Sequence, residues 1–578
     1  VLGDVYAEWE FLKDLKLKVS LGMDIMYLKQ NKYTPSNIYQ SLGIASAKVG
    51  VNRSINWLNE NILTWNKTFK DIHSLNILGG FTIQRNNVES VTGASSNFVN
   101  DVMKYNNLGA GSIYDKPESS ATQWSLMSYL ARINYSLYDR YLFSVNGRVD
   151  GSSRFGGNNK YGFFPSGSVA WRISEEGFME PVKAVINNLK LRTSYGFTGN
   201  TEIGVYESLA TLGSNSWTIG NQLVSGFYPN RIPNPDLKWE KTGQFDIGFD
   251  LGLFNNRLRL TADYYYKKTT DLLYNVAIPS ASGYDSMLKN IGSVQNKGYE
   301  LSIESDNLSG AFSWTTAFNI SFNRNKVLEL GGETYKDVGT YDDHLKTSDI
   351  RRLIVGQPIG VFYGYRFDGI FQNEAECAQQ TSSPSPIGVG LRRYKDLNGD
   401  GKIDATNDRE ILGDANPKFF GGMTNTFAYK GFELNVFLQY SYGNKIFNYN
   451  AMELESPTGG QNVYQDLVNR WTPTNPSNEY QKATTNRNNI VSDRFIEDGS
   501  FLKLKTVSLS YSFPKLNWKH LGGLRLYVTG QNLLTWTKYR GYDPEVSYRG
   551  ASTLEAGEDF GGYPQARTFM FGIKLDIK

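Results

Sequence analysis

The chain has 578 residues, and its 60 Lys and Arg residues nearly balance its 57 Asp and Glu residues, which leaves a formal net charge of +3. This balance gives no sign of a basic surface for nucleic acid or of an acidic tail. The lone Cys377 excludes an internal disulfide framework and a cysteine-rich zinc site. His73, His344 and His520 are scattered and lie in no motif, so we expect surface or capping roles for them rather than catalysis.

The chain contains no run of about 18 apolar residues, so no transmembrane helix is expected. A membrane location stays open, because a transmembrane strand faces lipid only at every second residue and its mean hydropathy is low. The first residues, "VLGDVYAEWEF", lack a basic segment followed by an apolar one. We therefore expect that a signal peptide is absent or already removed.

Period-two alternation is the strongest pattern along the chain, and it predicts strands with one apolar and one polar face. It begins at 15–27 and returns at 432–442 and at 568–578. The apolar sets are Leu15, Leu17, Val19, Leu21, Met23, Ile25 and Tyr27; Phe432, Leu434, Val436, Leu438, Tyr440 and Tyr442; and Phe569, Phe571, Ile573, Leu575 and Ile577.

The predicted strands are about 9–13 residues long, whereas strands of soluble sheets usually have about 5–6 residues. A tilted strand needs about 9–11 residues to cross a bilayer. Tyrosines gather near strand ends, in "ADYYYKK" (262–268) and "LQYSYGN" (438–444). This placement is typical of the aromatic girdle at a membrane interface.

Short and long connections alternate along the chain, as they do in outer-membrane barrels with short periplasmic turns and long outer loops. The short connections include Lys13-Asp14, Asp139-Arg140, Asn255-Asn256, Leu308–Gly310 and Lys430-Gly431. The long ones are roughly 92–122, 200–240, 272–296, 326–418 and 445–498. The pattern predicts an all-β fold, a transmembrane antiparallel β-barrel, with 326–418 as a long extracellular loop insertion.

About 17 strands are visible, with 361–371 assigned to an outer loop, whereas single-chain bacterial barrels have an even number of strands. If the short turns are periplasmic, both the first and the last strand run toward the periplasm. We therefore expect that strands before the first one are missing. Residues 1–578 are interpreted as the C-terminal part of a larger barrel.

Several stretches resemble the SusC/RagA-like TonB-dependent outer-membrane transporters of Gram-negative bacteria, and they keep their order over nearly the whole chain. They are "RYLFSVNGRVDGSSRFG" (140–156), "FFPSGSVAWRISEEGFM" (163–179), "LKWEKTGQFDIGFDLGLFNNRLRLTADYYYKKTTDLLY" (237–274), "GQPIGVFYGYRFDGIFQ" (356–372), "YKDLNGDGKID" (394–404), "LGDANPKFFGGMTNTFAYKGFELNVFLQYSYGNKIFN" (412–448) and "YDPEVS" (542–547).

The resemblance implies import rather than catalysis. Members of this family form barrels of about 22 strands with an N-terminal plug inside. Each member pairs with a SusD-like surface lipoprotein that closes over the outer face. TonB, energised by the proton gradient, pulls on the plug to admit the substrate. The substrates implied are oligosaccharides or peptides, and the partners implied are the SusD-like lipoprotein, TonB and outer-membrane lipid.

The sequence also departs from this family. It contains no plug and no TonB-binding segment, and against about 22 family strands about five are missing. Family members often end on an aromatic residue that is recognised during barrel insertion, whereas this chain ends in "LDIK". Either the terminus is trimmed, or Phe569 and Phe571 serve that role less directly.

The stretch "DLNGDGKIDATND" (396–408) resembles the start of an EF-hand loop, in which oxygens at positions one, three, five, seven and nine bind calcium and a glycine at six permits the turn. Position twelve is Asn407 instead of a bidentate acid. We expect a structural Ca²⁺ site that shapes the outer loop where a lid docks; an ion-free loop of Asx turns is the alternative. The candidate ligands are Asp396, Asn398, Asp400, Lys402 (through its carbonyl), Asp404 and, if the loop bulges, Asp408.

The sequence context of the other candidate residues indicates structural or surface roles rather than catalysis. The pairs Asp342-Asp343 and Glu175-Glu176 are interpreted as solvated loop acids and not as hydrolase carboxylates, because no surrounding pattern indicates a pocket. Trp217, Tyr228 and Tyr464 lie in predicted outer loops. They are suited to stacking on a substrate, to interface anchoring or to loop packing, and we assign no substrate-binding residue.

The sequence thus predicts the barrel portion of an active outer-membrane importer. A passive porin-like channel is the first alternative. An enzyme or an adhesin of the outer membrane is the second, and it would need a clustered catalytic set or extra folded domains.

Overall fold

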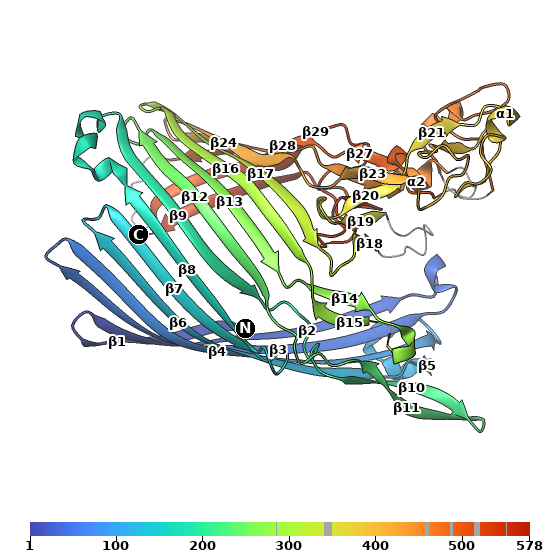
Figure 1. The fold of residues 1–578 in the computed structure, drawn as a ribbon, viewed down its shortest axis with the longest axis horizontal. Coiled ribbons are helices and arrows are strands. Elements are labelled where there is room, and N and C mark those ends of the chain that lie inside the picture. Colours follow the sequence, from blue (N-terminus) through green and yellow to red (C-terminus); the bar gives the residue numbers. More distant parts are fainter. Residues whose placement is uncertain are drawn as a thin grey trace. The chain divides into compact units, whose positions relative to one another are not determined.

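The computed structural model describes residues 1–284, 286–339, 350–456, 462–485, 489–513, 521–550 and 552–577. Within these residues, eighteen strands belong to one sheet, and seventeen of them remain when the four-residue β5 is left out. This agrees with the predicted number and confirms the all-β, antiparallel fold (Figure 1). No helix in the described ranges is long and apolar enough to span a bilayer.

The chain divides into two units. The first comprises residues 1–172, 192–245 and 269–292. Its sheet strands are β1 (Leu2–Leu12), β2 (Leu15–Thr34), β3 (Ser46–Phe69), β4 (His73–Phe98), β5 (Gly111–Tyr114), β6 (Glu118–Leu137), β7 (Tyr141–Ser152) and β8 (Tyr161–Arg172). We call β1–β4 and β6–β8 the wall. Two hairpins project from this unit: β10 (Thr211–Ile219) with β11 (Gln222–Arg231), and β14 (Leu273–Ala277) with β15 (Ser286–Asn290).

The second unit comprises residues 173–191, 246–268 and 293–578. Its sheet strands are β16 (Ser293–Leu308), β17 (Phe312–Glu329), β24 (Phe419–Tyr429), β25 (Phe432–Tyr442), β28 (Phe501–Ser512), β29 (Leu521–Thr537) and β31 (Thr568–Ile577). Three further sheet strands contain residues of both units: β9 (Ile186–Asn200), β12 (Glu240–Leu253) and β13 (Leu258–Thr270).

The alternation predicted from the sequence is confirmed by the strand register of the wall. Leu17 of β2 lies opposite Leu63 of β3, and Lys16 lies opposite Thr64. The apolar residues therefore share one face of neighbouring strands, and the polar residues share the other. Hydrogen bonds run across the polar face, for example from Ser20 Oγ to Glu60 Oε2 at 3.3 Å. We call the apolar side the outward face and the polar side the inner face.

The predicted strand length of about 9–13 residues is right for β25, β28 and β31 but too short for much of the wall. β2 and β6 have 20 residues, β3 has 24 and β4 has 26. On β4 the outward face is apolar from Leu75 to Ile83, which is about the length that crosses a bilayer. It then turns polar at Arg85, Asn87 and Glu89, so the alternation in the sequence fades while β4 continues.

The short turns lie where they were predicted, and several adopt left-handed backbone conformations. Lys430 and Gly431 join β24 to β25 with φ values of 44° and 89°. Asn255 and Asn256 both have φ of 58°. Hairpin turns favour positive φ because it matches the right-handed twist of the strands, and Asn and Gly tolerate it best. The tyrosine run of β13 splits between the two faces, because Tyr265 donates from its hydroxyl to Asn323 Oδ1 at 3.0 Å on the polar side.

The long connections of the second unit fold into one compact assembly, which we call the loop body: the described residues of 330–418, 443–500 and 538–567. As predicted, 361–371 belongs to these connections and not to the large sheet. Its elements are β18 (Tyr335–Val338), β19 (Arg351–Ile354), β20 (Val361–Tyr365), β21 (Phe367–Ile370), α1 (Glu374–Cys377), β22 (Arg392–Tyr394), β23 (Arg409–Asp414), β26 (Lys445–Asn448), α2 (Tyr449–Leu454), β27 (Ile496–Asp498) and β30 (Glu558–Asp559). Phe362, Phe447 and Phe495 form the centre of its hydrophobic core and are fully buried.

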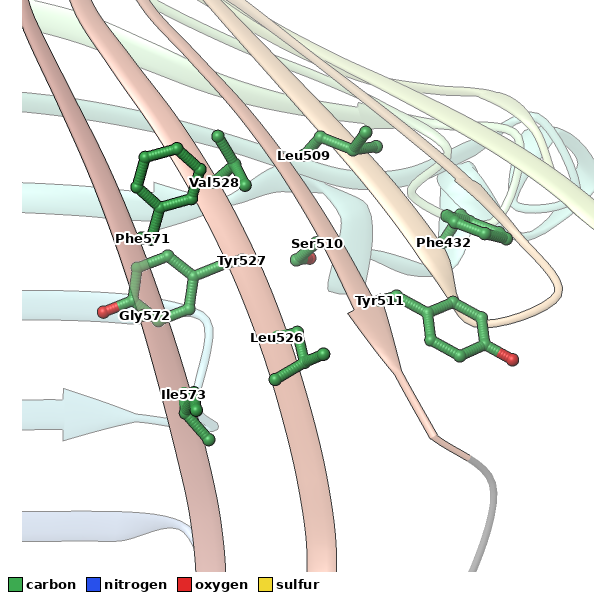
Figure 2. A pocket seen from close by; sticks show the side chains of 10 residues that line it. All are labelled: Phe432, Leu509, Ser510, Tyr511, Leu526, Tyr527, Val528, Phe571, Gly572 and Ile573. Carbon is green, nitrogen blue, oxygen red and sulfur yellow. The ribbon is translucent and has the colours of Figure 1, made fainter.

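The last strands carry an apolar hollow of about 500 Å³ on their outward face (Figure 2). Leu509, Val528 and Phe571 occupy matched positions on β28, β29 and β31. On the opposite face, the Tyr527 ring lies over Gly572, where a Cβ atom would meet the ring at 2.0 Å. The glycine therefore lets the tyrosine pack flat on the edge strand β31.

Candidate functional site

The predicted calcium loop, 396–408, lies within the loop body between β22 and β23. Its first turn is organised by Asp396. One carboxylate oxygen accepts a hydrogen bond from Gly399 N at 2.6 Å, and the other accepts from Gly401 N at 2.7 Å. Both glycines have φ of 76°, a conformation that other residues rarely adopt. The loop therefore has the tight turn that the glycine at position six predicts.

The next carboxylates also accept backbone hydrogen bonds. Asp400 Oδ1 accepts from Lys402 N at 2.8 Å, and Asp400 Oδ2 accepts from Asn398 Nδ2 at 3.0 Å. Asp404 Oδ1 accepts from Thr406 N and from Asn407 N, both at 2.8 Å. The backbone hydrogen bonds from Asn407 and Thr406 lower the pKa of the Asp404 carboxyl below its usual range.

Asp408 closes the base of the loop. Its side chain is fully buried, and its two carboxylate oxygens accept from Leu397 N and Asp404 N, both at 2.8 Å. The carboxylate thus connects the two ends of the loop. This role depends on its burial, which the EF-hand spacing of the sequence does not indicate.

Apolar packing holds the loop against the rest of the loop body. Ile403, at position eight, is 2% exposed and packs with Tyr365 and Tyr394. Its backbone N–H donates to Ser382 O at 2.9 Å, and Thr381 N donates to Gly401 O at 2.7 Å. The buried side chain of Ile403 therefore anchors the loop to the loop body.

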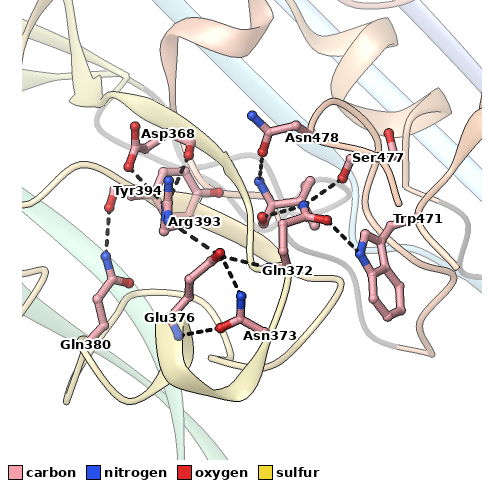
Figure 3. Close-up of polar contacts among 11 residues, drawn as sticks. Asp368, Gln372, Asn373, Glu376, Gln380, Arg393, Tyr394, Trp471, Ser477 and Asn478 are labelled. Carbon is pink, nitrogen blue, oxygen red and sulfur yellow. Dashed lines mark hydrogen bonds and ion pairs between the residues drawn. The ribbon is translucent and has the colours of Figure 1, made fainter. Parts of the chain in front are cut away.

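A polar network continues from β22 to the neighbouring segments (Figure 3). Arg393 forms ion pairs with Asp368 at 3.0 Å and with Glu376 at 3.5 Å. Gln372 contributes a second branch, because its Nε2 donates to Ser477 O at 3.0 Å and its Oε1 accepts from Trp471 Nε1 at 3.2 Å. The contacts of Gln372 fix the segment that precedes the loop to residues 99 and 105 positions later in the chain.

The six predicted ligand residues lie in one short loop, but their carboxylates are spread along it. Across the ranges that the structure describes, no group of three or more His, Cys, Asp or Glu side chains is arranged to hold a metal ion. The oxygen-rich side chains and the tight glycine turn suit a hard cation such as Ca²⁺. Calcium binding therefore stays a prediction.

Sequence reasoning missed a set of buried ion pairs in the loop body. Arg351 Nε lies 3.0 Å from Glu558 Oε1, and each side chain is 1% exposed. Burial raises the pKa of the Glu558 carboxyl, although Arg351 and Arg549 both face it. Arg351 and Glu558 are 207 positions apart in the sequence, so no local sequence pattern predicts this ion pair.

The "YDPEVS" motif has a clear structural role. Lys503, on β28, is 2% exposed and forms ion pairs with Asp543 and Glu545, both at 2.6 Å. Glu545 also accepts from Lys505 Nζ at 3.0 Å. The motif therefore ties the connection between β29 and β31 to the inner face of β28.

Two other quoted motifs meet in the first unit. Phe155, from "SSRFG", lies with its ring centroid 4.8 Å from that of Trp239, from "LKWEK". Leu237 is fully buried in the same cluster, and Trp239 Nε1 donates to Lys160 O at 3.1 Å. These residues form a small hydrophobic core within the first unit.

The remaining candidates have ordinary surroundings. Trp217 and Tyr228 contact each other edge-to-face, with centroids 6.4 Å apart, on the hairpin β10–β11. Tyr464 packs against the core of the loop body. Glu175 lies 4.0 Å from Lys183, and both side chains are roughly half exposed. Asp342, Asp343, His344 and His520 lie outside the described residues.

A family model and similar curated proteins all relate this chain to TonB-dependent receptors. The family model of TonB-dependent receptor-like β-barrels matches residues 4–370. TonB-dependent receptor P3 of Formosa agariphila is 39% identical over 99% of this chain and 57% of its own length. TonB-dependent receptor SusC of Bacteroides thetaiotaomicron is 30% identical over 99% of this chain and 55% of its own length.

Among solved structures, the RagAB peptide transporter has a chain with a TM-score of 0.85 and 26% identity, covering 99% of this chain and 61% of that one. This chain therefore spans a little more than half the length of these relatives.

Proposed function

Since this chain belongs to the TonB-dependent receptor-like β-barrel family, we propose that it forms the barrel portion of an active outer-membrane importer. Proteins of this family are β-barrels of the outer membrane, and this chain supplies a large part of such a barrel. The wall, with its mainly apolar outward face and polar inner face, is the observation that carries the proposal. Such a wall separates lipid from an aqueous interior.

Two strands support the proposal that other parts of the protein complete the barrel. β1 is exposed at all 11 of its residues, on both faces, and β31 is exposed at all but one of its 10. Strand edges are costly in hydrocarbon, because unpaired backbone groups find no water there. We infer that further strands of the protein pair with these edges, and that a plug with a TonB-binding segment accompanies them.

The substrates that we propose are oligosaccharides or peptides, taken up with a SusD-like surface lipoprotein. The structural similarity to the RagAB peptide transporter favours a two-component importer. The similarity to SusC supports the same arrangement. The loop body, with its own core and ion pairs, offers the rigid outer platform that such a lid needs.

A test separates active import from the alternative of a passive channel. Cells that carry the full-length protein are given fluorescent oligosaccharides or peptides, and uptake is measured before and after an ionophore collapses the proton gradient. Uptake that depends on the protein and stops with the ionophore supports the importer. Uptake that continues unchanged identifies a passive channel, and a general porin substrate serves as the control for membrane integrity.

We further propose that the loop at 396–408 binds a structural Ca²⁺. Asp396, Asn398, Asp400 and Asp404 supply side-chain oxygens, Lys402 supplies its carbonyl, and Asp408 braces the base of the loop. Bound calcium would neutralise the closely spaced carboxylates and stiffen the loop. A weak site suffices, since extracellular calcium sites bind with dissociation constants of about 10⁻⁴–10⁻³ M.

Hydrogen exchange of the full-length protein tests this second proposal. We expect calcium to slow exchange at 392–414 compared with a chelator, and Asp400→Ala to remove that difference while the barrel still inserts. Glu374→Ala, which changes an exposed carboxylate of the same connection, is the matched control and should respond to calcium as the native protein does. An identical exchange profile with calcium and with chelator in the native protein would rule the site out.

A further inference from the structure

A polar hollow of about 330 Å³ lies on β3, β4 and β6, a volume in the range of small-molecule sites. Six of the residues that line it can contact a ligand through their side chains: Arg53, Ile55, Asn87, Glu89, Gln123 and Tyr206. The register places Ile55 opposite Asn87, and Asn87 opposite Gln123. These three residues therefore share the face that carries Trp65, Ile77 and Ile133 further along the same strands. The hollow thus opens on the outward face of the wall.

The hollow begins where the apolar band of that face ends. Along β4, Ile77, Phe81 and Ile83 are followed on the same face by Arg85, Asn87 and Glu89. Trp57 of β3 lies opposite Arg85, at the boundary. Aromatic residues mark the membrane interface, and charged residues beyond it lie at the level of the lipid head groups.

Arg53 lines the hollow and Arg85 lies beside it on β4, and both have hydrogen-bonding capacity left over. Arg53 Nη1 lies 4.0 Å from Glu89 Oε2, and the two side chains are 54% and 66% exposed. This pair is too long for a hydrogen bond. Arg85 donates from Nη2 to Gln123 Oε1 at 2.6 Å, but its Nε is buried and has no hydrogen-bond partner among the described residues. The exposed guanidinium of Arg53, which is too far from Glu89 for a hydrogen bond, is therefore available to an additional acceptor in the hollow.

A loop residue closes one side of the hollow. β7 stops pairing with β6 where Ser152 lies opposite Leu126, whereas β6 continues to Glu118. On this free edge, Gln123 N donates to the Tyr206 hydroxyl at 3.0 Å. Arg231 holds Tyr206 in place by donating from Nη1 to its carbonyl oxygen at 3.2 Å. The hollow is therefore built by strands and loop together.

We propose that this hollow binds the phosphorylated sugar head group of an outer-leaflet glycolipid. Arg53 and Arg85 bind phosphate oxygens, for which guanidinium groups are well suited. Asn87, Gln123 and Glu89 bind sugar hydroxyls. The acyl chains then continue along the apolar part of the same face, past Ile55 and Ile83.

The position favours a lipid over a soluble ligand. The polar hollow and the apolar band are continuous on one face, so a molecule with a polar head and apolar chains matches both. A free sugar or a free phosphate would occupy only the polar hollow and would leave the apolar band uncovered. The site faces away from the inner face of the wall, so it is separate from the proposed path of the imported substrate.

Native mass spectrometry of the purified full-length protein in neutral detergent tests the proposal. The probes are rough-type lipopolysaccharide, the same lipid after enzymatic dephosphorylation, phosphatidylglycerol and inorganic phosphate. We expect the intact lipopolysaccharide to bind best. We expect Arg53→Gln combined with Arg85→Gln to raise the concentration for half-saturation about tenfold or more, because two charge-assisted contacts are lost.

The control is Arg132→Gln, which removes an arginine from the inner face of β6 and should leave lipid binding unchanged. Heat-dependent mobility on a gel verifies that each variant is folded. Equal binding by the double variant overturns the proposal. So does equal binding of phosphatidylglycerol, which indicates general attraction to anionic lipid, or of dephosphorylated lipid or inorganic phosphate.

Discussion

The wall and the loop body are built from similar residues but bury them in opposite ways. In the wall, large apolar side chains such as Val145 and Tyr129 are 62% and 50% exposed. In the loop body, Phe362, Phe447 and Phe495 are not exposed at all. The difference follows from the solvent, because lipid surrounds the outward face of the wall, whereas a loop region in water must bury its own apolar surface.

Charged residues show a similar contrast between the strands of the large sheet and the loop body. The Arg259–Glu304 pair joins the sheet strands β13 and β16 with side chains 47% and 54% exposed. In the loop body, the Arg351–Glu558 pair is 1% exposed on both sides. A buried pair stabilises only while both partners are present, since a lone buried charge is costly. The loop body should therefore be far more sensitive to single charge changes than the strands of the large sheet.

The largest effect is expected for Arg351→Met. Glu558 then stays buried without its nearest cation, which should destabilise the loop body by about 3–5 kcal/mol. Hydrogen exchange should show faster exchange throughout the loop body and unchanged protection in the wall. The combination Arg351→Met with Glu558→Leu should recover much of the loss, and persistent loss in that variant would mean that the charge pair is not the cause.

The next effect concerns two neighbouring residues of β7. Val145 lies on the outward face and Asn146 on the inner face. Val145→Arg should cost about 2–4 kcal/mol if the residue lies near the bilayer midplane, because the charge faces lipid, whereas Asn146→Arg should cost little. Urea unfolding of the protein in lipid vesicles measures both variants. Equal costs would show that the two faces are not divided between lipid and water.

A smaller, pH-dependent effect is expected at the "YDPEVS" motif. Burial alone would raise the pKa of the Glu545 carboxyl, but hydrogen bonds and charges from Lys503 and Lys505 outweigh it and lower the pKa. The folded state therefore favours the carboxylate. Its stabilisation is present above the ordinary pKa of 4.5 and is lost as the pH falls below it.

Limited proteolysis near 538–547 measures this effect. We expect cleavage of the native protein to increase as the pH falls through this window, after correction for the activity of the protease. Glu545→Gln should be cleaved faster at neutral pH and should show a weaker dependence on pH, with the pair between Lys503 and Asp543 left in place. The same steep dependence in both proteins would assign it to another group.

The smallest effect is expected for Arg259→Gln. This change breaks an ion pair of similar length to that of Arg351 and Glu558, 2.9 Å against 3.0 Å, but an exposed one. Exposed pairs contribute about 0–1 kcal/mol, so the unfolding midpoint in vesicles should hardly move. A loss comparable to that of Arg351→Met would remove the distinction between the loop body and the strands of the large sheet.

Strand faces and short turns were predictable, because period-two patterns and turn residues act locally. The alternation at 15–27 sets the register of β2, and Lys430-Gly431 marks the turn between β24 and β25. The outer end of β4 was not predictable, because its outward face turns polar at Arg85, Asn87 and Glu89. The roles of Asp408 and Lys503 depend on burial and on partners that other segments bring to them, which one sequence does not reveal.

The length of β4 has a consequence at the cell surface. Its 26 residues extend about 85 Å, and at a tilt of about 40° they rise about 65 Å, against a hydrocarbon thickness of about 30 Å. The outer end of β4 should therefore stand well above the leaflet, clear of the innermost sugars. Antibodies and phage tails should reach this end of the strand directly, whereas lipid covers the apolar band below it.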